Sequence, residues 1–266
     1  MSEAQGFHHL PVLYEQTLAA LSVVPEGVYA DGTIGGGGHA AGILKGLGEE
    51  GRLFGIDRDK EALDATEKRI GDDPRLRLIQ GNFHDVKALL PGIMLDGALL
   101  DLGVSSWQLD SSKRGFSYHA DAPLDMRMNQ SAGITAAEWL NNKDEITIRD
   151  ALYQYADERW AARIAQVILE MRKEKPFETT GDLVCAVDRA IPRAVRQKEE
   201  GHPARRAFQA VRIAVNDEIA PLARALEDWV SMLKPGGRLA VISFHSIEDR
   251  VVKQTFKRLQ TGCVCP

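Results

Sequence analysis

A run of glycines near the N-terminus constrains the fold of this chain most. The short apolar segment Gly27–Ala30 leads into Asp31-Gly32-Thr33-Ile34-Gly35-Gly36-Gly37-Gly38-His39, and a helix-compatible stretch begins at Ala40. A strand, a glycine turn and a helix in this order form the first half of a Rossmann-type nucleotide-binding unit. One glycine is enough for a strand and a helix to pack closely, so four in succession favour a ligand lying against the turn.

The following segments place further polar residues at the ends of predicted strands. Arg52–Ile56 predicts a second strand that ends at Asp57, nineteen residues after Gly38. A carboxylate at this distance commonly binds the two hydroxyl groups of a ribose. Leu76–Ile79 and Asp96–Asp101 predict two more strands, and Phe83 follows the first of them, where it is either a core residue or a neighbour of the ligand. Carboxyl ends of parallel strands meet at one edge, so we expect Asp57, Phe83 and Asp101 in one crevice of an α/β, Rossmann-like sheet.

The charge at the glycine turn indicates which cofactor is bound. Gly35-x-Gly37-x-x-Ala40 also fits a dinucleotide-binding pattern, so the glycines alone do not decide. A carboxylate at Asp31 would repel a pyrophosphate at the helix N-terminus, but it would attract the ammonium and sulfonium groups of S-adenosylmethionine. S-adenosylmethionine is therefore the expected cofactor, and an NAD-dependent oxidoreductase is the alternative.

The regular alternation of strands and helices is interrupted in the middle of the chain. Between Gly103 and about Ala210 the sequence predicts loops and helices, with a capping box at Thr135-x-x-Glu138. The strand pattern resumes with the Lys234–Gly237 turn and the strand Arg238–Phe244. We therefore expect a discontinuous methyltransferase domain that binds the cofactor, formed by residues 1–107 and 211–266, and an inserted, mainly helical substrate-recognition domain at 108–210.

Composition limits the partners of the chain. The 266 residues are 44% hydrophobic and 27% charged, which is typical of a globular protein, and the formal net charge is -5. An acidic protein is not expected to coat nucleic acid, yet seven Lys and Arg residues lie between Arg189 and Arg212 against only two Glu. This segment is either an RNA-facing patch or a solvated surface. No apolar run reaches the roughly 20 residues of a membrane span, so we expect a cytoplasmic protein with no membrane partner.

The cysteines argue against a disulfide framework and a thiolate mechanism. There are three, Cys185, Cys263 and Cys265, in a chain without a signal peptide. Cys263-x-Cys265 resembles half of a metal site, but no second pair accompanies it, so we expect no metal. None of the three follows a predicted strand, which disfavours methylation at C5 of a pyrimidine because that reaction needs a cysteine nucleophile.

Several sequence blocks extend these observations to a family resemblance. They span nearly the whole chain: His9-Leu10-Pro11-Val12-Leu13, Asp31-Gly32-Thr33, Gly37-Gly38-His39, Asp101-Leu102-Gly103-Val104-Ser105-Ser106, Arg114-Gly115-Phe116-Ser117, Pro123-Leu124-Asp125-Met126-Arg127-Met128, Arg206-Ala207-Phe208-Gln209-Ala210-Val211-Arg212 and Ser243-Phe244-His245-Ser246-x-Glu248-Asp249-Arg250. Together they resemble the ribosomal RNA small subunit methyltransferase H family, also called MraW, within the class I S-adenosylmethionine-dependent methyltransferases.

The resemblance implies an activity and a set of cofactor residues. It implies methylation of the exocyclic N4 of a cytosine in the decoding region of 16S rRNA, in the bacterial cytoplasm. The family's cofactor positions correspond here to Gly37, Gly38, His39, Asp57, Phe83, Asp101 and Gln108, to which the charge of Asp31 adds an eighth. Phe83 thereby becomes a predicted adenine neighbour. Family members usually continue beyond the position of Pro266, so the far edge of the sheet is left unassigned.

The chemistry of an aromatic amine suggests the catalytic residues. The amine lone pair is delocalised into the ring, so acceptors facing its N–H bonds must favour a pyramidal nitrogen, and alignment of bound reactants can supply ~7–11 kcal/mol. Asp101 is the predicted acceptor, although Leu102-Gly103-Val104 replaces the Pro-Pro-aromatic sequence of DNA amino-methyltransferases, so a purely cofactor-binding role stays open. His245 is the second candidate, for binding the base or relaying its proton, or else a residue that bonds backbone at a helix start.

The predicted RNA contacts lie mostly in the insertion. Trp107, Phe116 and Tyr118 are candidates for base stacking, and Arg205, Arg206 and Arg212 for phosphate contacts. Because the chain is acidic overall, we expect it to recognise 16S rRNA assembled in the small ribosomal subunit; the oligomeric state is left open, a homodimer included. Two alternatives remain: methylation of another RNA nucleobase, and a non-catalytic ribosome assembly factor that binds S-adenosylmethionine.

Overall fold

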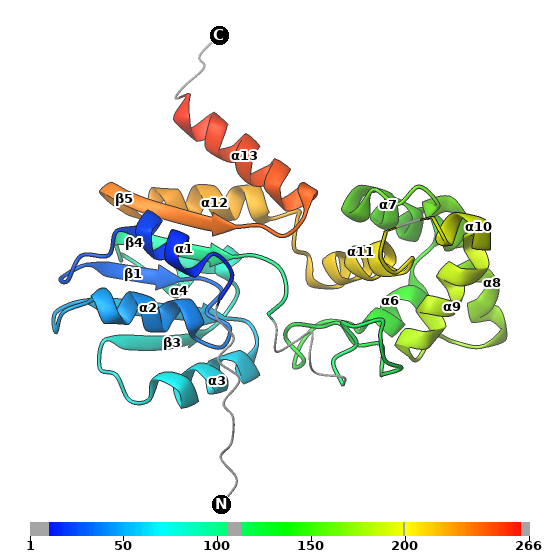
Figure 1. Ribbon diagram of the computed structural model, residues 1–266, viewed down its shortest axis with the longest axis horizontal. Coiled ribbons are helices and arrows are strands. Elements are labelled where there is room, and N and C mark those ends of the chain that lie inside the picture. The colour runs from blue at the N-terminus through cyan, green and yellow to red at the C-terminus, as the bar shows by residue number, and fades with distance from the viewer. Residues whose placement is uncertain (1–10, 106–112, 199, 262–266) are drawn as a thin grey trace, which may run out of the picture. The chain divides into compact units, whose positions relative to one another are not determined.

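The computed structural model describes residues 11–105, 113–198 and 200–261 (Figure 1). Contacts between Cα atoms divide the chain into two compact units. The described parts of 1–103 and 222–266 form the sheet unit, and those of 104–221 form the helical unit. We expected boundaries after residues 107 and 210. The second boundary lies later because the helix Arg205–Asn216 packs on helices of the insertion.

The sheet unit contains five parallel strands. All four pairings between neighbouring strands are parallel, and the order across the sheet is β3-β2-β1-β4-β5. This confirms the predicted α/β, Rossmann-like class. The strands are β1 (Val28–Asp31), β2 (Arg52–Asp57), β3 (Leu76–Gln80), β4 (Leu95–Asp101) and β5 (Leu233–Ile242).

Helices cover the sheet on both faces (Figure 1). On one face, the first three helices and the sheet share a core that includes Leu21, Ile43, Leu63 and Leu99. On the other face, the 3-10 turn Phe83–Asp85 packs against the helix Leu222–Ser231. The helical elements of this unit are α1 (Tyr14–Leu21), α2 (Gly38–Gly46), α3 (Lys60–Ile70), the 3-10 turn η1 (Phe83–Asp85), α4 (Val86–Leu89), α12 (Leu222–Ser231) and α13 (Ser246–Gln260).

The start of β5 differs from the sequence prediction. We expected a turn at Lys234–Gly237 ahead of the strand, but β5 begins at Leu233 and these residues form a bulge inside it. Leu233 pairs with Leu95 and Arg238 pairs with Gly97, so the four intervening residues of β5 stand opposite a single residue of β4, Asp96. Gly236 allows the bulge because its φ is 84°, a value that favours glycine.

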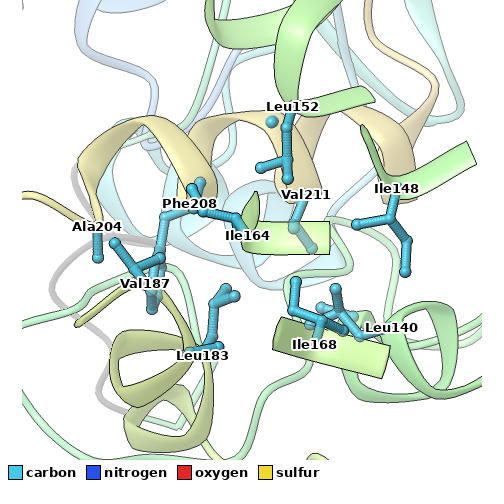
Figure 2. Close-up of a cluster of buried hydrophobic side chains, with 14 of the residues drawn as sticks. Leu140, Ile148, Leu152, Ile164, Ile168, Leu183, Val187, Ala204, Phe208 and Val211 are labelled. Atoms are coloured by element: carbon cyan, nitrogen blue, oxygen red, sulfur yellow. The ribbon is translucent and has the colours of Figure 1, made fainter. Parts of the chain in front are cut away.

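The helical unit has its own hydrophobic core. Leu140, Ile148, Ile164, Leu183 and Phe208 come from different helices and meet in one buried cluster (Figure 2). The predicted capping box at Thr135 and Glu138 is present at the start of α6. The helices are α6 (Ala136–Asn142), α7 (Glu145–Ala156), α8 (Ala161–Glu174), α9 (Thr180–Ala190), α10 (Arg193–Arg196) and α11 (Arg205–Asn216).

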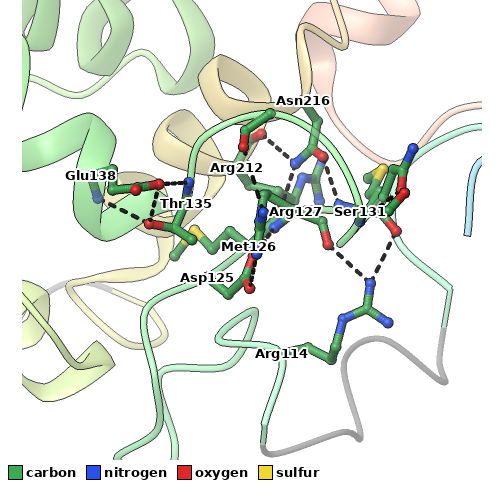
Figure 3. Close-up of polar contacts among 12 residues, drawn as sticks. Arg114, Asp125, Met126, Arg127, Ser131, Thr135, Glu138, Arg212 and Asn216 are labelled. Carbon is green, nitrogen blue, oxygen red and sulfur yellow. Dashed lines mark hydrogen bonds and ion pairs between the residues drawn. The ribbon is translucent and has the colours of Figure 1, made fainter.

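Buried polar contacts tie the loop before α6 to α11 (Figure 3). Asn216 accepts the N–H of Met128 at 2.8 Å and donates to the carbonyls of Met126 at 2.7 Å and Arg212 at 2.9 Å. The Arg114 guanidinium, also buried, donates to the carbonyls of Arg127 and Met128 at 2.9 and 3.0 Å. Two side chains thus satisfy backbone groups of a segment that has no regular secondary structure.

Among the described residues, no helix combines the length and the apolar character needed to cross a bilayer.

We predict that Asn216→Ala destabilises the helical unit by about 2–3 kcal/mol, because it leaves buried backbone groups without partners. Hydrogen–deuterium exchange in increasing urea, read on peptides of the helical unit, measures this loss. Asn142→Ala is the matched control: its amide donates to the Glu138 carbonyl in an exposed position, and we expect a loss below about 1 kcal/mol. Equal losses in the two variants would contradict the role assigned to Asn216.

Candidate functional site

The glycine turn connects β1 to α2 through tight backbone contacts. The Gly32 N–H donates to the Leu99 carbonyl on β4 at 2.9 Å, and a side chain at Gly32 would collide with Leu100 and Trp229. Gly37 precedes α2 with φ 74°, and a Cβ there would lie 2.9 Å from Thr66. The turn therefore needs glycine at both positions, and its backbone follows one fixed path along the edge of the sheet.

Three carboxyl groups end three neighbouring strands. Asp31, Asp57 and Asp101 are the last residues of β1, β2 and β4, which adjoin one another in the sheet. The predicted gathering of Asp57 and Asp101 beside the glycine turn is thus observed, and Asp31 lies between them.

Backbone N–H groups hold the first two carboxyls in place. Asp31 Oδ1 accepts the Thr33 N–H at 3.1 Å. Asp57 accepts the Gly35 N–H at 2.9 Å on one oxygen and the Asp59 N–H at 2.9 Å on the other. Each oxygen of Asp57 keeps a further lone pair, so the group can still accept hydrogen bonds from a ribose.

Asp101 is held differently, through its backbone rather than its carboxyl group. Its N–H donates to the Thr33 hydroxyl at 2.6 Å, which joins the end of β4 to the turn after β1. Its Oδ1 is buried and has no hydrogen-bond partner, and its Oδ2 lies 3.7 Å from His39 Nδ1. His39 Nε2 donates to the Val12 carbonyl at 3.1 Å, so the ring presents an unprotonated nitrogen to Asp101. Burial lowers the His39 pKa, which keeps this ring neutral.

Burial strongly perturbs all three carboxyls. Burial, with a smaller contribution from the nearby Asp101 and Asp57, raises the pKa of Asp31 to about 8, although the Thr33 N–H opposes the shift. The pKa of Asp57 rises to about 6, although the N–H groups of Asp59 and Gly35 oppose the shift. That of Asp101 rises to about 7 by burial and by the charge of Glu248. A cation placed among them offsets these costs, which fits the sulfonium and ammonium groups of S-adenosylmethionine.

The same values refine the electrostatic argument made from the sequence. From the sequence we expected Asp31 to be a carboxylate in the ligand-free protein, but only 1% of its surface is exposed, and its raised pKa of about 8 favours the protonated form at neutral pH. The attraction for a cationic cofactor therefore develops as Asp31 loses its proton.

Two other predicted cofactor residues border the turn. Gly38 is the first residue of α2, and a Cβ there would lie 2.4 Å from Pro11. Phe83 begins η1, and its carbonyl accepts the Trp229 indole N–H at 2.9 Å. Phe83 is half-buried, its Cβ would lie 3.1 Å from a Cβ built on Gly32, and its ring meets the His84 ring edge-on at 4.2 Å between centroids. Gln108 and Trp107 lie outside the described residues, as do Cys263 and Cys265.

His245 is engaged within its own helix start. Its Nδ1 accepts the Glu248 N–H at 3.3 Å and caps α13. Its Nε2 lies 3.1 Å from Glu248 Oε1, but not in hydrogen-bonding geometry. Glu248 Oε2 also accepts the Phe244 N–H at 2.9 Å. Both ring nitrogens therefore face α13, which favours a positioning role over the proton relay weighed in the sequence analysis.

Glu248 is the residue that the sequence reasoning missed. It is 2% exposed and its charge acts on Asp101, yet in the sequence it stood only within the block Ser243–Arg250, without a role of its own. The signal available was its spacing of three from His245, which is equally common in helix caps without function.

The predicted RNA contacts separate into exposed and buried side chains. Phe116 is 6% exposed and lies in the core of the helical unit, and Arg212 forms a two-bond ion pair with Glu218. Arg205 and Arg206 are exposed at the start of α11. The burial of Phe116 argues against base stacking by this ring, because a base reaches it only by displacing core contacts.

The rings of Tyr118, His119 and His202 form an aromatic cluster near the start of α11. The Tyr118 ring stacks on His202 at 4.6 Å between centroids, with 21° between the planes, and His119 adjoins both. His202 lies three residues before the start of α11, and its carbonyl accepts the Arg205 N–H. No cluster of His, Cys, Asp or Glu suited to a metal ion occurs in the parts of the chain that the structure describes.

We predict that affinity for S-adenosylmethionine increases between about pH 6 and about pH 8, as Asp57, Asp101 and Asp31 lose protons. Calorimetry measures it, with an upper limit of roughly tenfold per pH unit for each linked group. Because the folded-state pKa values are raised, the ligand-free protein binds more protons than the unfolded chain, and its stability falls as pH rises through this window. S-adenosylhomocysteine, whose sulfur is uncharged, should show a shallower dependence.

Asp31→Asn is the control for this prediction. The amide oxygen can still accept the Thr33 N–H, but the buried charge is gone. We expect a ligand-free protein that is more stable at about pH 8, and a weaker, less pH-dependent affinity for S-adenosylmethionine. An affinity that does not change with pH in the wild-type protein would disprove the linkage.

Comparisons with known proteins agree with the family resemblance. The model of the MraW methylase family matches residues 6–266. Three proteins named ribosomal RNA small subunit methyltransferase H are similar to the chain, and each alignment covers 98% of it. Those of Symbiobacterium thermophilum and Heliobacterium modesticaldum are both 52% identical, and the alignments cover 83% and 84% of their own lengths. That of Geobacter sp. (strain M21) is 49% identical, with 85% of its length covered. With its parallel sheet and strand-end acids, this chain belongs to the MraW methylase family.

Proposed function

We propose that this protein transfers a methyl group from S-adenosylmethionine to the exocyclic N4 of a cytosine in the decoding region of 16S rRNA. One observation supports the cofactor most directly: one buried and two partly buried carboxyls end adjacent strands around a glycine turn, in a chain of a methylase family. The names of the relatives support ribosomal RNA of the small subunit as the substrate. An enzyme that methylates ribosomal RNA of the small subunit is expected in the cytoplasm.

The residues divide between holding the cofactor and serving the reaction. Asp57 is suited to the ribose hydroxyls, and Phe83 to the adenine. Gly37, Gly38 and His39 shape the turn against which the rest of the cofactor lies, with Asp31 supplying negative charge. Bound S-adenosylmethionine provides an electrophilic methyl group attached to a sulfonium.

Asp101 is suited to activate the amine. As the nitrogen gains a methyl group, it must lose one proton, and an acceptor facing its N–H bond favours the reactive geometry. Asp101 Oδ1 is buried and unpartnered, and a pKa of about 7 lets the group give up its own proton and then accept one near neutral pH. Neutral His39 stands behind the other oxygen of the carboxyl. No cysteine is needed, and the described one, Cys185, lies on α9 of the helical unit.

The helical unit is suited to hold the RNA. Exposed Arg205 and Arg206 can contact phosphates, and the stacked pair Tyr118 and His202 offers a flat surface for an unpaired base. Phe116 and Arg212 are less suited to contact RNA, because Phe116 lies in the core of the helical unit and Arg212 is paired with Glu218. Since this patch is small on an acidic protein, we propose the assembled small subunit as the substrate rather than free RNA.

We predict that purified small subunits accept methyl groups far better than free 16S transcript, with N4-methylcytosine as the product detected by mass spectrometry. Asp101→Asn should lower the rate on small subunits about a hundredfold or more, because the amide cannot accept the proton. An unchanged rate in Asp101→Asn would remove the catalytic role. A wild-type protein that binds S-adenosylmethionine but forms no methylated nucleoside on either RNA would instead indicate an assembly factor.

We predict that a double substitution, Arg205→Ala with Arg206→Ala, weakens small-subunit binding and reduces its salt dependence. Each phosphate contact that is lost should lower the slope of log affinity against log salt by about 0.9 or less. Affinity for S-adenosylmethionine should not change, as calorimetry can verify. Arg224→Ala, which removes an 87% exposed arginine from the sheet unit, is the control. A double variant that binds like this control would contradict the assignment of the patch.

A further inference from the structure

A phenylalanine follows β5 at the carboxyl edge of the sheet with its ring largely in solvent. Phe244 is 51% exposed, although it comes two residues after the buried strand end Ile242. Removing an aromatic ring from water is favourable, so the exposure of Phe244 has a free-energy cost that contacts within the sheet unit do not offset.

Strand register places this ring beside Asp101. Asp101 pairs with Ile242, and the Leu102 N–H donates to the Ile242 carbonyl at 2.9 Å. The segments that follow β4 and β5 leave the sheet side by side, so Gly103 lies next to Phe244. A Cβ built on Gly103 would be 3.4 Å from Cδ2 of the ring, an ordinary contact distance. Phe244 therefore packs against the backbone that immediately follows Asp101.

The backbone under the ring is fixed. The Phe244 N–H donates to Glu248 Oε2 at 2.9 Å, and the next residue, His245, caps α13. Glu248 itself is almost completely buried. The backbone that carries the ring is thus set before any ligand arrives, while about half of the residue (51%) stays exposed, an arrangement suited to stacking.

The strand order indicates which ligand this ring faces. Asp57 ends β2, Asp31 ends β1, Asp101 ends β4 and Phe244 follows β5, and these strands are successive neighbours. At about 4.8 Å per strand, the ends of β2 and β5 are roughly 14 Å apart. If the cofactor's ribose lies at Asp57 and its reactive end lies towards Asp101, Phe244 stands beyond that end, where the methyl acceptor must be.

We propose that Phe244 stacks on the target cytosine and holds its exocyclic amine towards Asp101. This inference rests on the proposed function and adds the residue that captures the acceptor base. A base removed from its RNA stack loses favourable ring contacts, and an aromatic side chain can restore them. The ring that performs this task thus comes from the sheet unit, from the strand next to the one that carries the proton acceptor.

Three variants and a control test the proposal on small subunits. Phe244→Ala should lower kcat/KM for methyl transfer about tenfold to a hundredfold, and Phe244→Leu should lower it comparably, because leucine covers apolar surface but cannot stack. Phe244→Tyr should stay within about threefold of the wild type, because it keeps the aromatic face. Met94→Ala removes a 44% exposed side chain just before β4, at the opposite edge of the sheet, and should have no effect.

Calorimetry with S-adenosylmethionine distinguishes stacking from misfolding, since all four variants should bind the cofactor as the wild type does. Full activity in Phe244→Leu would show that the ring only covers apolar surface, and full activity in Phe244→Ala would show that it has no role; either result overturns this inference alone. A wild-type protein that binds the cofactor but methylates no small subunits overturns the proposed function, and this inference with it.

Discussion

The complete burial of Asp31 and the partial burial of Asp57 and Asp101 at adjacent strand ends form the constraint on which the rest of the site depends. Parallel pairing brings Asp31, Asp57 and Asp101 to one edge, and each loses water there. Backbone N–H groups compensate two of them, through Thr33 for Asp31 and through Gly35 and Asp59 for Asp57. Asp101 Oδ1 has no such partner. The fold therefore maintains an arrangement that is costly when ionised and empty, and the cost disappears when a cation occupies it.

This cost also explains selectivity between cofactors more fully than charge alone. At neutral pH Asp31 is mostly protonated, so simple attraction of a distant cation is weak. Occupation by a sulfonium lowers the pKa values of the group, releases protons and gains the attraction locally. A pyrophosphate at the same turn would raise those pKa values further and would place an anion against buried acids. We therefore expect selection between cofactors to operate through proton release coupled to binding.

The sequence predicted the strand-end acids but not the residues that depend on tertiary contacts. Asp31, Asp57 and Asp101 could be placed because each follows a short apolar run, and parallel strands bring such ends together. Phe116 and Tyr118 occupy one loop without periodicity, so the sequence does not reveal that the Phe116 ring joins the buried core while the half-buried Tyr118 ring packs against His202 and Phe208. Glu248 looked like an ordinary capping residue because nothing local reveals its proximity to Asp101. Trp107 and Gln108 stay predictions, outside the described residues.

The bulge in β5 determines which residues of the last strand lie beside Asp101. Leu95 pairs with Leu233, and a regular pairing from there would set Asp101 opposite Leu239. Because Lys234–Gly237 loops out, Asp101 instead pairs with Ile242, and the segment that begins at Phe244 leaves the sheet beside Gly103. A glycine with positive φ at one end of the strand therefore determines which residues stand next to the acid at the other end. The Pro-Gly-Gly sequence resembles an ordinary turn, but through this bulge it helps to position Phe244, His245 and Glu248 near Asp101.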